Sequence, residues 1–370
     1  WERKKLGIYV PITMGQSPNS KNYTNNPRDN ILVQGNADLY NNRVLKRTFT
    51  TEVTKIADRN DILISVRAPV GDIARNQYES IVIGRGIAAI KGNNFLYYQL
   101  EKMNNSGFWK KYIAGSTFES ITGKDLKSSD IYISNHKEEK SIGDIFQTLT
   151  KTIQLHERKC EELALIKKAL LQKLFPKKDE FKPEVRYKNF SDAWEQRKLG
   201  EVATFINGRA YKQNELLDSG KYKVLRVGNF YTNDSWYYSN LELADKYYID
   251  KGDLVYTWSA TFGPHIWDGE KVIYHYHIWK IELSESLDRD FTLQILEADK
   301  AKLLANTNGS TMIHVTKKDM ESKVISLPNI EEQKQIGSYL MKFDSLIALH
   351  QRKLEKLKQL KKFLLQNMFI

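Results

Sequence analysis

The sequence predicts an α+β protein built from two tandem mixed α/β domains, each followed by a long helix. Three observations support this class: the chain repeats itself at long range, both copies contain β-rich apolar runs, and both copies end in a heptad pattern. The repeat is much longer than the roughly 20–50 residues of a solenoid unit. We therefore expect a duplicated two-part unit that presents two similar surfaces about a pseudo-twofold axis.

The duplication is visible in short motifs that return in the same order. A polar segment precedes Trp194 in the second copy, but the given sequence has no counterpart of it before Trp1. The repeat therefore predicts a short leader segment before Trp1. The matched pairs are Trp1-Glu2 with Trp194-Glu195, Asp61-Ile62-Leu63 with Asp253-Leu254-Val255, Gly115-Ser116-Thr117 with Gly309-Ser310-Thr311, and residues 131–175 with residues 325–369, aligned without a gap.

Each copy contains the same order of predicted elements before its long helix. Apolar runs rich in β-branched residues and bounded by turn residues indicate strands, and a helical period indicates one helix. The first copy has strands at Asp61–Val66 and Ser80–Ile90, the latter interrupted by Gly84 and Gly86, and a helix at Phe95–Lys111. The second has strands at Tyr222–Val227, Asp253–Trp258 and Val272–Leu283 and a helix at Phe291–Leu304.

The long predicted helices have apolar residues in alternating steps of three and four, which is the pattern of a coiled coil. Pro176 ends the first of them. Two such helices most simply pack antiparallel, which would hold the two domains at opposite ends. The predicted segments are a first domain (1–136), a spacer helix (137–176), a linker (177–193), a second domain (194–329) and a second spacer helix (330–370).

The apolar stripe identifies the seam expected between the helices. His156 and His350 occupy the same repeat position and are expected to pair there, and Cys160 is expected as a small apolar filler. The seam residues are Leu149, Ile153, His156, Leu163, Leu170, Phe343, Ile347, His350, Leu357 and Leu364, and the stripe also includes Ile145, Ile166 and Leu360.

Composition favours a polyanionic partner. The formal net charge is +12 and the isoelectric point is near 9.3, which suits nucleic acid or an anionic surface. No run of 18 apolar residues and no signal-peptide pattern is found, so neither a membrane span nor secretion is indicated. A single cysteine excludes an intramolecular disulfide and is consistent with a reducing cytoplasm.

Catalytic signatures are not found in the sequence. It lacks a GxxxxGK[ST] phosphate loop, a glycine-rich cofactor loop and the Pro-Pro motif of adenine methylation. His275-Tyr276-His277 places two imidazoles on one face of a predicted strand, but no third metal ligand is near in sequence. The sequence therefore predicts no catalytic residue, no metal ligand and no cofactor bound by this chain.

Binding chemistry is abundant in comparison. Arginine can recognise guanine, small hydroxyl-bearing loops can approach a phosphate, and aromatic rings can stack on a base, although each such residue can also be surface or core. The basic helices can form a phosphate track, a partner-docking surface or a solvated face. The candidate nucleic-acid-binding residues are Arg67, Ser116, Thr117, Lys124, Arg209, Tyr211, Lys212, Trp258, Ser259, Ser310, Thr311, His314 and Lys317.

Four features in a fixed order identify a resemblance. They are the Trp-Glu-x-x-Lys-Leu-Gly entry at Trp1 and Trp194, the run from Asp61 to Gly71, the Gly-Ser-Thr loops, and the Pro328–Ile336 entry into the second long helix. Over essentially its whole length the chain resembles the specificity subunits of type I restriction-modification systems. The first helix entry, Ser134–Lys140, lacks the proline and glutamine of that pattern.

The resemblance implies two target-recognition domains, each recognising one half of a bipartite, asymmetric double-stranded DNA site, with the helices fixing the spacer. It implies two methyltransferase subunits docked on the helices, and separate ATP-driven restriction and translocase subunits. S-adenosylmethionine, ATP and Mg²⁺ would belong to those partners, so this chain would be non-catalytic. Half-sites about one duplex turn, about 34 Å, apart would match such helices.

Two other functional classes fit parts of the pattern. The chain could be the recognition portion of a single-chain restriction–methylation enzyme, which an upstream methyltransferase motif in the gene would reveal. It could instead be a coiled-coil scaffold that binds no DNA. That scaffold would show no salt-dependent DNA affinity, whereas phosphate contacts produce a steep fall in affinity with salt.

Overall fold

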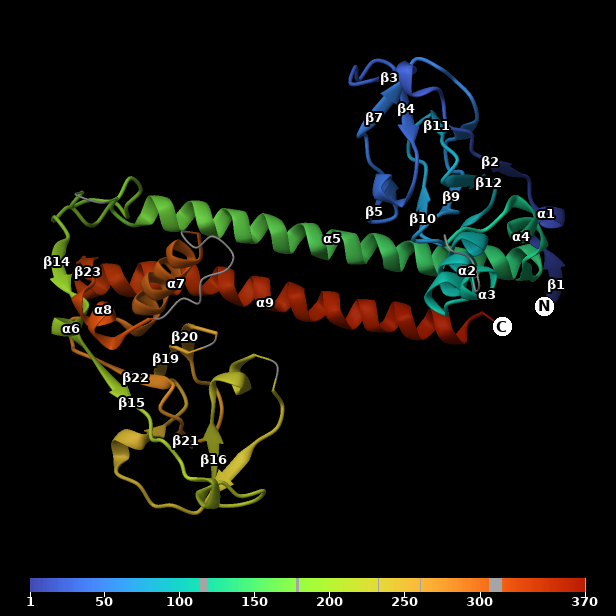
Figure 1. Ribbon diagram of the computed structural model, residues 1–370. Helices are drawn as coiled ribbons and strands as arrows, with labels where there is room; N and C mark the ends of the chain where they lie inside the picture. Colours follow the sequence, from blue (N-terminus) through green and yellow to red (C-terminus); the bar gives the residue numbers. More distant parts are fainter. Residues whose placement is uncertain (114–118, 178–179, 232, 260, 306–314, 370) are drawn as a thin grey trace. The chain divides into compact units, whose positions relative to one another are not determined.

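The computed structural model describes residues 1–370 except 114–118, 178–179, 232, 260, 306–314 and 370 (Figure 1). It divides into two compact units. Unit 1 comprises Trp1–Arg158 and Gln351–Ile370, and unit 2 comprises Lys159–His350. Each unit holds one β-rich copy with segments of both long helices, so the predicted α+β class is confirmed. Among the described helices, none is long and apolar enough to cross a membrane.

Unit 1 is built on two mixed sheets and a separate strand pair. Strands β9 and β12 are buried at every position because they lie inside the six-stranded sheet. The pair is β1 (Glu2–Lys5) with β13 (Asp130–Ile133); the six-stranded sheet is β2 (Ile12–Met14), β12 (Ile87–Ile90), β9 (Ile62–Ser65), β10 (Ile73–Arg75), β6 (Arg43–Val44) and β5 (Leu39–Tyr40); and the five-stranded sheet is β3 (Tyr23–Thr24), β7 (Thr48–Thr50), β4 (Asn30–Val33), β11 (Ser80–Ile83) and β8 (Ile56–Asp58).

Short helices close unit 1 around these sheets. Asn93 caps α2 by accepting a hydrogen bond from the Leu96 backbone N–H, and a Thr122–Asp125 capping box begins α4. The helices are α1 (Leu6–Tyr9), α2 (Asn94–Asn105), α3 (Lys110–Ile113) and α4 (Gly123–Ser128), with single 3₁₀ turns η1 (Ser20–Asn22) and η2 (Asn36–Asp38).

The prediction of one continuous helix over Phe95–Lys111 is wrong at residues 106–109, where the helix is broken. Helix α2 ends at Asn105, and α3 begins only at Lys110. Gly107 between them has a φ of +72°, a left-handed conformation that a continuing helix does not contain.

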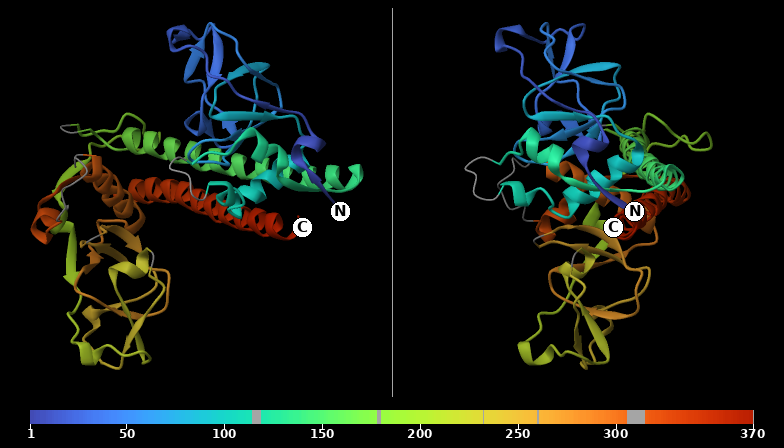
Figure 2. Two further views of the ribbon diagram at one scale, coloured as in Figure 1. Left: turned by 45° about the vertical axis from the view of Figure 1, so that its right-hand side comes forward. Right: turned by 90° about the vertical axis from the view of Figure 1, so that its right-hand side faces the viewer.

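Unit 2 repeats this plan with smaller sheets (Figure 2). The pair is β14 (Glu195–Lys198) with β23 (Val324–Leu327); one four-stranded sheet is β15 (Ala203–Asn207), β22 (Ile278–Leu283), β19 (Leu254–Thr257) and β20 (Gly263–Ile266); and the other is β17 (Tyr237–Ser239), β16 (Tyr222–Leu225), β21 (Val272–Tyr274) and β18 (Tyr248–Ile249). The helices are α6 (Leu199–Val202), α7 (Arg289–Ala305) and α8 (Lys317–Ser322), with 3₁₀ turns η3 (Gln213–Glu215), η4 (Val227–Phe230) and η5 (Asp245–Tyr247).

Two of the predicted strands are each two strands that belong to different sheets. Ser80–Ile90 divides into β11 and β12, and Val272–Leu283 divides into β21 and β22. His275-Tyr276-His277 therefore forms a tight turn, and its prediction as strand residues with two imidazoles on one face is wrong. The chain has to leave one sheet and enter the other within three residues.

The long helices are α5 (His136–Leu174) and α9 (Ile330–Asn367), and each unit contains a segment of both. In unit 1 the segments run antiparallel, since Phe146 stacks on Phe369 and Glu157 pairs with Lys358 at 2.7 Å. In unit 2 Lys167 pairs with Asp344, and Leu174 shares the core with Ile336 and Leu340.

The predicted apolar stripe is wrong at Ile145, Ile166 and Leu360, each of which is 46% exposed. In unit 1 the neighbouring Phe146 is fully buried because it packs between Tyr98 of α2 and Phe369. Of the predicted seam residues, Leu149, Ile153 and Leu163 are buried, and the half-buried members are His156, Leu170, Phe343, Ile347, His350, Leu357 and Leu364. Cys160 is half-buried and reduced.

Candidate nucleic-acid interface

In unit 1 the ends of three strands and one tight turn meet at a single surface. We call it strand-end surface 1 and define it as Gly15–Ser17, Gln34-Gly35, Val66-Arg67 and Gly84–Gly86. The Gly84 N–H donates to the Val33 carbonyl at 2.8 Å, which joins the turn to the end of β4. The Val66 N–H donates to the Gly86 carbonyl at 2.9 Å, which joins it to the end of β9.

Arg67 lies exposed at this surface, directly after β9. Its backbone forms a bridge with Ser120, and the Ala68 N–H donates to the Glu119 carbonyl at 3.0 Å. The segment that follows the Gly-Ser-Thr loop is thus attached beside Arg67. Ser116 and Thr117 themselves lie outside the described residues.

Lys124 is exposed in the first turn of α4. A Cβ added to the preceding Gly123 would lie 3.0 Å from Cγ of Met14, so the start of α4 packs on the end of β2. Lys124 therefore stands next to strand-end surface 1, at the N-terminus of a helix where backbone N–H groups favour an anion.

Unit 2 has the equivalent surface, strand-end surface 2, defined as Gly208–Ala210, Arg226, Trp258-Ser259 and His275–His277. Here the His275 N–H donates to the Leu225 carbonyl at 2.9 Å, and the Trp258 N–H donates to the His277 carbonyl at 3.1 Å. Of the predicted residues, Arg209, Trp258 and Ser259 belong to it. Ser310, Thr311 and His314 lie outside the described residues.

The guanidinium group of Arg209 is hydrogen-bonded to a side chain of the same unit. Both terminal guanidinium nitrogens donate to the Glu215 carboxylate, at 2.9 and 2.8 Å. These bonds, with one from the Lys212 backbone N–H, lower the pKa of Glu215 to about 2. The pair fixes the Gly208–Glu215 loop, so recognition of guanine by Arg209 stays a prediction that would require this pair to open.

The other predicted residues of unit 2 also have defined surroundings. The Trp258 ring stacks on Trp279 with centroids 5.8 Å apart, and its indole N–H donates to the Tyr276 carbonyl at 3.0 Å. Tyr211 packs against the apolar cluster of Val224 and Ile273. Lys212 is exposed, and Lys317 lies 3.6 Å from Glu321 one turn further along α8.

Burial holds His265 and His275 of unit 2 in their neutral form. Burial, together with nearby His277 and Arg226, lowers the pKa of His275 to about 4. Burial and Lys300 lower the pKa of His265 to about 4 as well, and its Nε2 lies 3.1 Å from the Tyr231 hydroxyl. Among the described residues no group of three or more His, Cys, Asp or Glu side chains could hold a metal ion.

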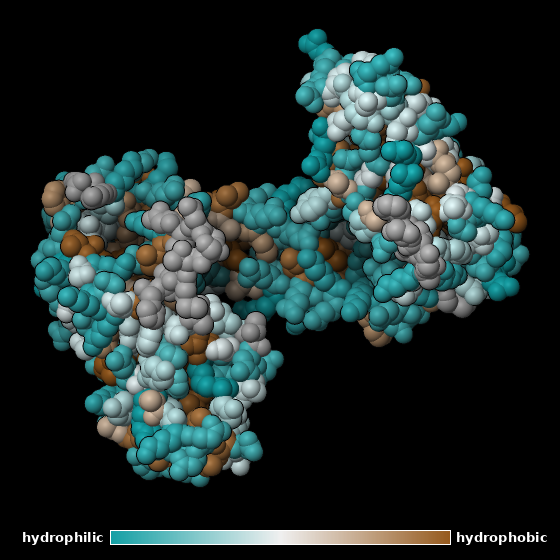
Figure 3. Space-filling model, viewed as in Figure 1, coloured by the Kyte–Doolittle hydropathy of each residue, from teal (hydrophilic) through white to brown (hydrophobic). Residues whose placement is uncertain are grey.

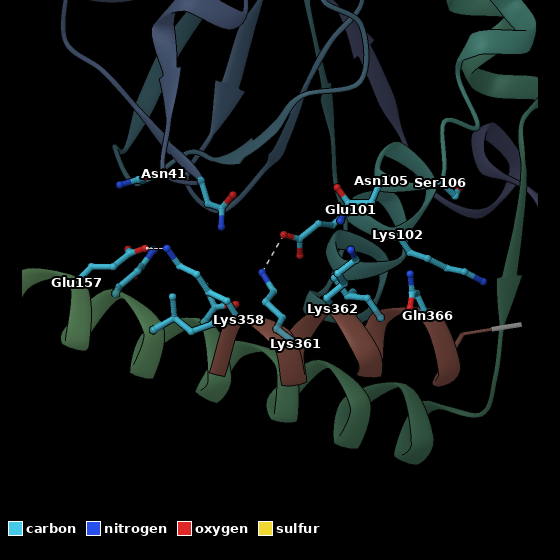
Figure 4. Close-up of a pocket in the computed structure, with 15 residues that line it drawn as sticks. Asn41, Glu101, Lys102, Asn105, Ser106, Glu157, Lys358, Lys361, Lys362 and Gln366 are labelled. Atoms are coloured by element: carbon cyan, nitrogen blue, oxygen red, sulfur yellow. Dashed lines mark hydrogen bonds and ion pairs between the residues drawn. The ribbon is translucent and has the colours of Figure 1, made fainter. Parts of the chain in front are cut away.

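A second feature of unit 1 is a cavity of about 600 Å³ between the β5–β6 turn, α2, the middle of α5 and the C-terminal end of α9 (Figure 4). Asn41 of the turn is one of its lining residues, and Glu101 accepts from Lys361 at 2.8 Å. Lys102 donates to the Phe369 carbonyl, and burial lowers the pKa of its ammonium. These bonds connect α2 to α9 and to the residue that follows it, so we assign the cavity a structural role.

Comparison with known proteins assigns the chain to a family. The model of the type I restriction modification DNA specificity domain matches residues 1–165 and again residues 191–359. The chain belongs to this family of DNA specificity domains. The two matches correspond to the two copies of the repeat, so the strand-end surfaces occupy the same place in two specificity domains.

Individual relatives agree with this assignment. The putative type I restriction enzyme MjaX specificity subunit of Methanocaldococcus jannaschii is 34% identical over 186 residues, which cover 47% of this chain and 42% of that protein. The EcoBI specificity subunit of Escherichia coli is 27% identical over 42% of this chain and 33% of that protein. The matches thus span less than half of either relative.

Solved structures show the same fold over the whole chain. The S subunit of a type I restriction-modification system from M. genitalium superimposes with a TM-score of 0.70 at 15% identity, covering 100% of this chain and 96% of that one. At that identity the match supports the fold of the specificity domains rather than the role of any residue.

Sequence reasoning missed the turn at each strand-end surface. Arg85 and Tyr276 occupy the same turn position and are both exposed. The available signal was Gly84-Arg85-Gly86 between two β-rich runs, which indicates a tight turn rather than an interrupted strand.

Proposed function

We propose that the chain is the DNA specificity subunit of a type I restriction-modification complex. In this role each specificity domain recognises one half of a bipartite, asymmetric double-stranded DNA site. The observation that supports this most strongly is the presence of two family matches in one chain with equivalent strand-end surfaces of different side chains. Two half-sites of different sequence require such a pair, because the scaffold can stay constant while the contacting side chains differ.

The charge of the chain supports DNA as the ligand. A formal net charge of +12 attracts the phosphate backbone, and Arg67 and Lys124 are exposed cations at strand-end surface 1. Binding should therefore weaken steeply as salt is raised, because each neutralised phosphate releases counterions.

The long helices fit the docking of two methyltransferase subunits. Unit 1 exposes Ile145, Leu155 and Leu360. In unit 2, Leu349 is equivalent to Leu155 and Ile166 is equivalent to Leu360, and both are exposed. Tyr339, equivalent to Ile145, is also exposed. Apolar side chains exposed at equivalent positions are expected of two equal docking sites; hydrophobic residues are visible among the mainly hydrophilic surface in Figure 3.

In this proposal the chain performs no chemistry. S-adenosylmethionine would be bound by the methyltransferase subunits, and ATP and Mg²⁺ by a restriction and translocase subunit. The chain would position its half-sites so that a partner can rotate an adenine out of the duplex for methylation.

The test is to map methylated adenine across the genome of cells that express this chain with its cognate methyltransferase subunit. The expected result is a split motif with a fixed spacer and one modified adenine in each half. An assembled, active complex that adds no such methylation would refute the proposal. Omitting the chain is the control, and it should abolish the motif.

A further inference from the structure

The tight turn at each strand-end surface has the same backbone structure in both units. In unit 1 the Ile87 N–H donates to the Gly84 carbonyl at 3.0 Å, and in unit 2 the Ile278 N–H donates to the His275 carbonyl at 3.0 Å. Ile87 accepts from Gly15 at 2.9 Å, and Ile278 accepts from Gly208 at 3.1 Å. Gly84-Arg85-Gly86 and His275-Tyr276-His277 are therefore equivalent residue by residue.

The strand end beside each turn is equivalent too. The Gln16 N–H donates to the Ile83 carbonyl at 2.9 Å, and the Arg209 N–H donates to the Tyr274 carbonyl at 3.0 Å. A Cβ on Gly15 would lie 2.1 Å from the Gly84 carbonyl oxygen, and one on Gly208 would lie 2.4 Å from that of His275. Because the backbone at this position lies so close to the carbonyl oxygen of the turn, only glycine fits there, and both copies have it.

On this constant frame the turn side chains have opposite chemistry. In unit 1 a single cation, Arg85, stands between two glycines, and its guanidinium has no hydrogen-bond or ionic partner among the described residues. In unit 2 the rings of His275, Tyr276 and His277 cluster, with the Tyr276 and His277 centroids 3.9 Å apart. The indole of Trp258 meets His277 edge-on at 4.9 Å.

At the tip of the turn the difference is not required by the fold, although the flanking Gly86 is: a Cβ there would lie 2.3 Å from the Gln34 carbonyl oxygen. The backbone bonds that form the turn are the same with either set of side chains, and Arg85 and Tyr276 are both exposed. A conserved frame with divergent exposed side chains is what recognition of two different ligands requires, as each half-site would present different base edges.

We infer that these two turns are specificity-determining elements, with Arg85 contacting a base edge in one half-site and Tyr276 contacting a base in the other. The inference rests on the proposed function and names the residues through which it acts. An arginine free at the tip of a turn can donate two parallel hydrogen bonds to O6 and N7 of guanine. The aromatic turn of unit 2 offers instead a ring face, a hydroxyl and two imidazoles.

The charge states of the two turns agree with this division. The lowered pKa of His275 and of His277 keeps both imidazoles neutral near pH 7. The turn of unit 2 therefore presents neutral donors and acceptors where the turn of unit 1 presents a permanent cation.

The test compares the methylated motif of the wild-type complex with those of Arg85→Ala, Arg85→Lys and Tyr276→Ala. We expect Arg85→Ala to lower discrimination at one position of one half-site by about tenfold or more and to leave the other half unchanged. Tyr276→Ala should do the reverse. Arg85→Lys keeps the charge but loses the paired donors, so it should resemble Arg85→Ala.

Arg59→Ala is the matched control, because Arg59 is an exposed arginine of unit 1 before the start of β9, whereas the turn contacts the end of that strand. It should leave the motif unchanged. Full rescue by Arg85→Lys, or equal weakening on all sequences, would make Arg85 a phosphate contact and overturn the inference. An unchanged motif in Arg85→Ala would also overturn it, whereas loss of any split motif from the wild-type complex would refute the proposed function instead.

Discussion

At the scale of single residues, Arg67 and Arg209 have different surroundings although both follow a strand end. Arg209 forms an ion pair with Glu215, in which the Arg209 side chain is 30% exposed and the Glu215 side chain 18% exposed. We expect Arg209→Ala to lower the free energy of unfolding only slightly, because it removes a partly exposed ion pair that solvent screens. Arg67→Ala should leave stability unchanged and instead cost about 1–3 kcal/mol of discrimination in one half-site.

Thermal unfolding and DNA binding of the two variants check this prediction side by side. If Arg209→Ala lowered sequence discrimination in one half-site with no loss of stability, that result would support the predicted role of Arg209 in base recognition.

A second prediction at this scale concerns His265. Its pKa is lowered from 6.5 to about 4, so the unfolded chain binds a proton more readily than the folded chain. The stability contributed by neutral His265 is therefore fully present above about pH 6.5 and is lost as pH falls toward 4, by up to about 3 kcal/mol. An NMR titration of its ring protons should give a midpoint near 4; a midpoint near 6.5 would contradict the burial argument.

At the scale of elements, Phe146 should anchor α5 in unit 1. Its side chain is fully buried between Tyr98 and Phe369, whereas its neighbour Ile145 is 46% exposed. We expect Phe146→Ala to destabilise unit 1 by about 3–5 kcal/mol through the cavity it leaves. Ile145→Ala is the matched control and should cost less than about 1 kcal/mol. Denaturant unfolding measures both, and equal costs would support the predicted stripe instead.

The same residues show what the sequence can and cannot predict about elements. Heptad spacing correctly predicted two long helices, because the period is a property of each helix alone. It misplaced Ile145, Ile166 and Leu360, because a heptad rule assumes one partner; in unit 1 α5 packs on both α9 and α2. Likewise Gly84 and Gly86 can indicate a turn within Ser80–Ile90, but only long-range pairing assigns β11 and β12 to different sheets.

At the scale of the whole molecule, the duplication was the most informative feature of the sequence. It correctly predicted the α+β class and the family, because the motifs recur in a fixed order. It could not identify the turn residues Arg85 and Tyr276, since their equivalence depends on backbone bonds between distant strands. The pairing of Arg209 with Glu215 was also invisible, because the intervening loop gives no periodic signal.

The central claim is that each specificity domain recognises its own half-site, and exchanging a domain tests it most directly. Residues 194–324 would be replaced by residues 1–130, joined where β13 and β23 align. The methylated motif of this chain with its methyltransferase subunit would then be determined. We predict a symmetric motif with the first half-site present twice as an inverted repeat. An unchanged asymmetric motif would contradict the account.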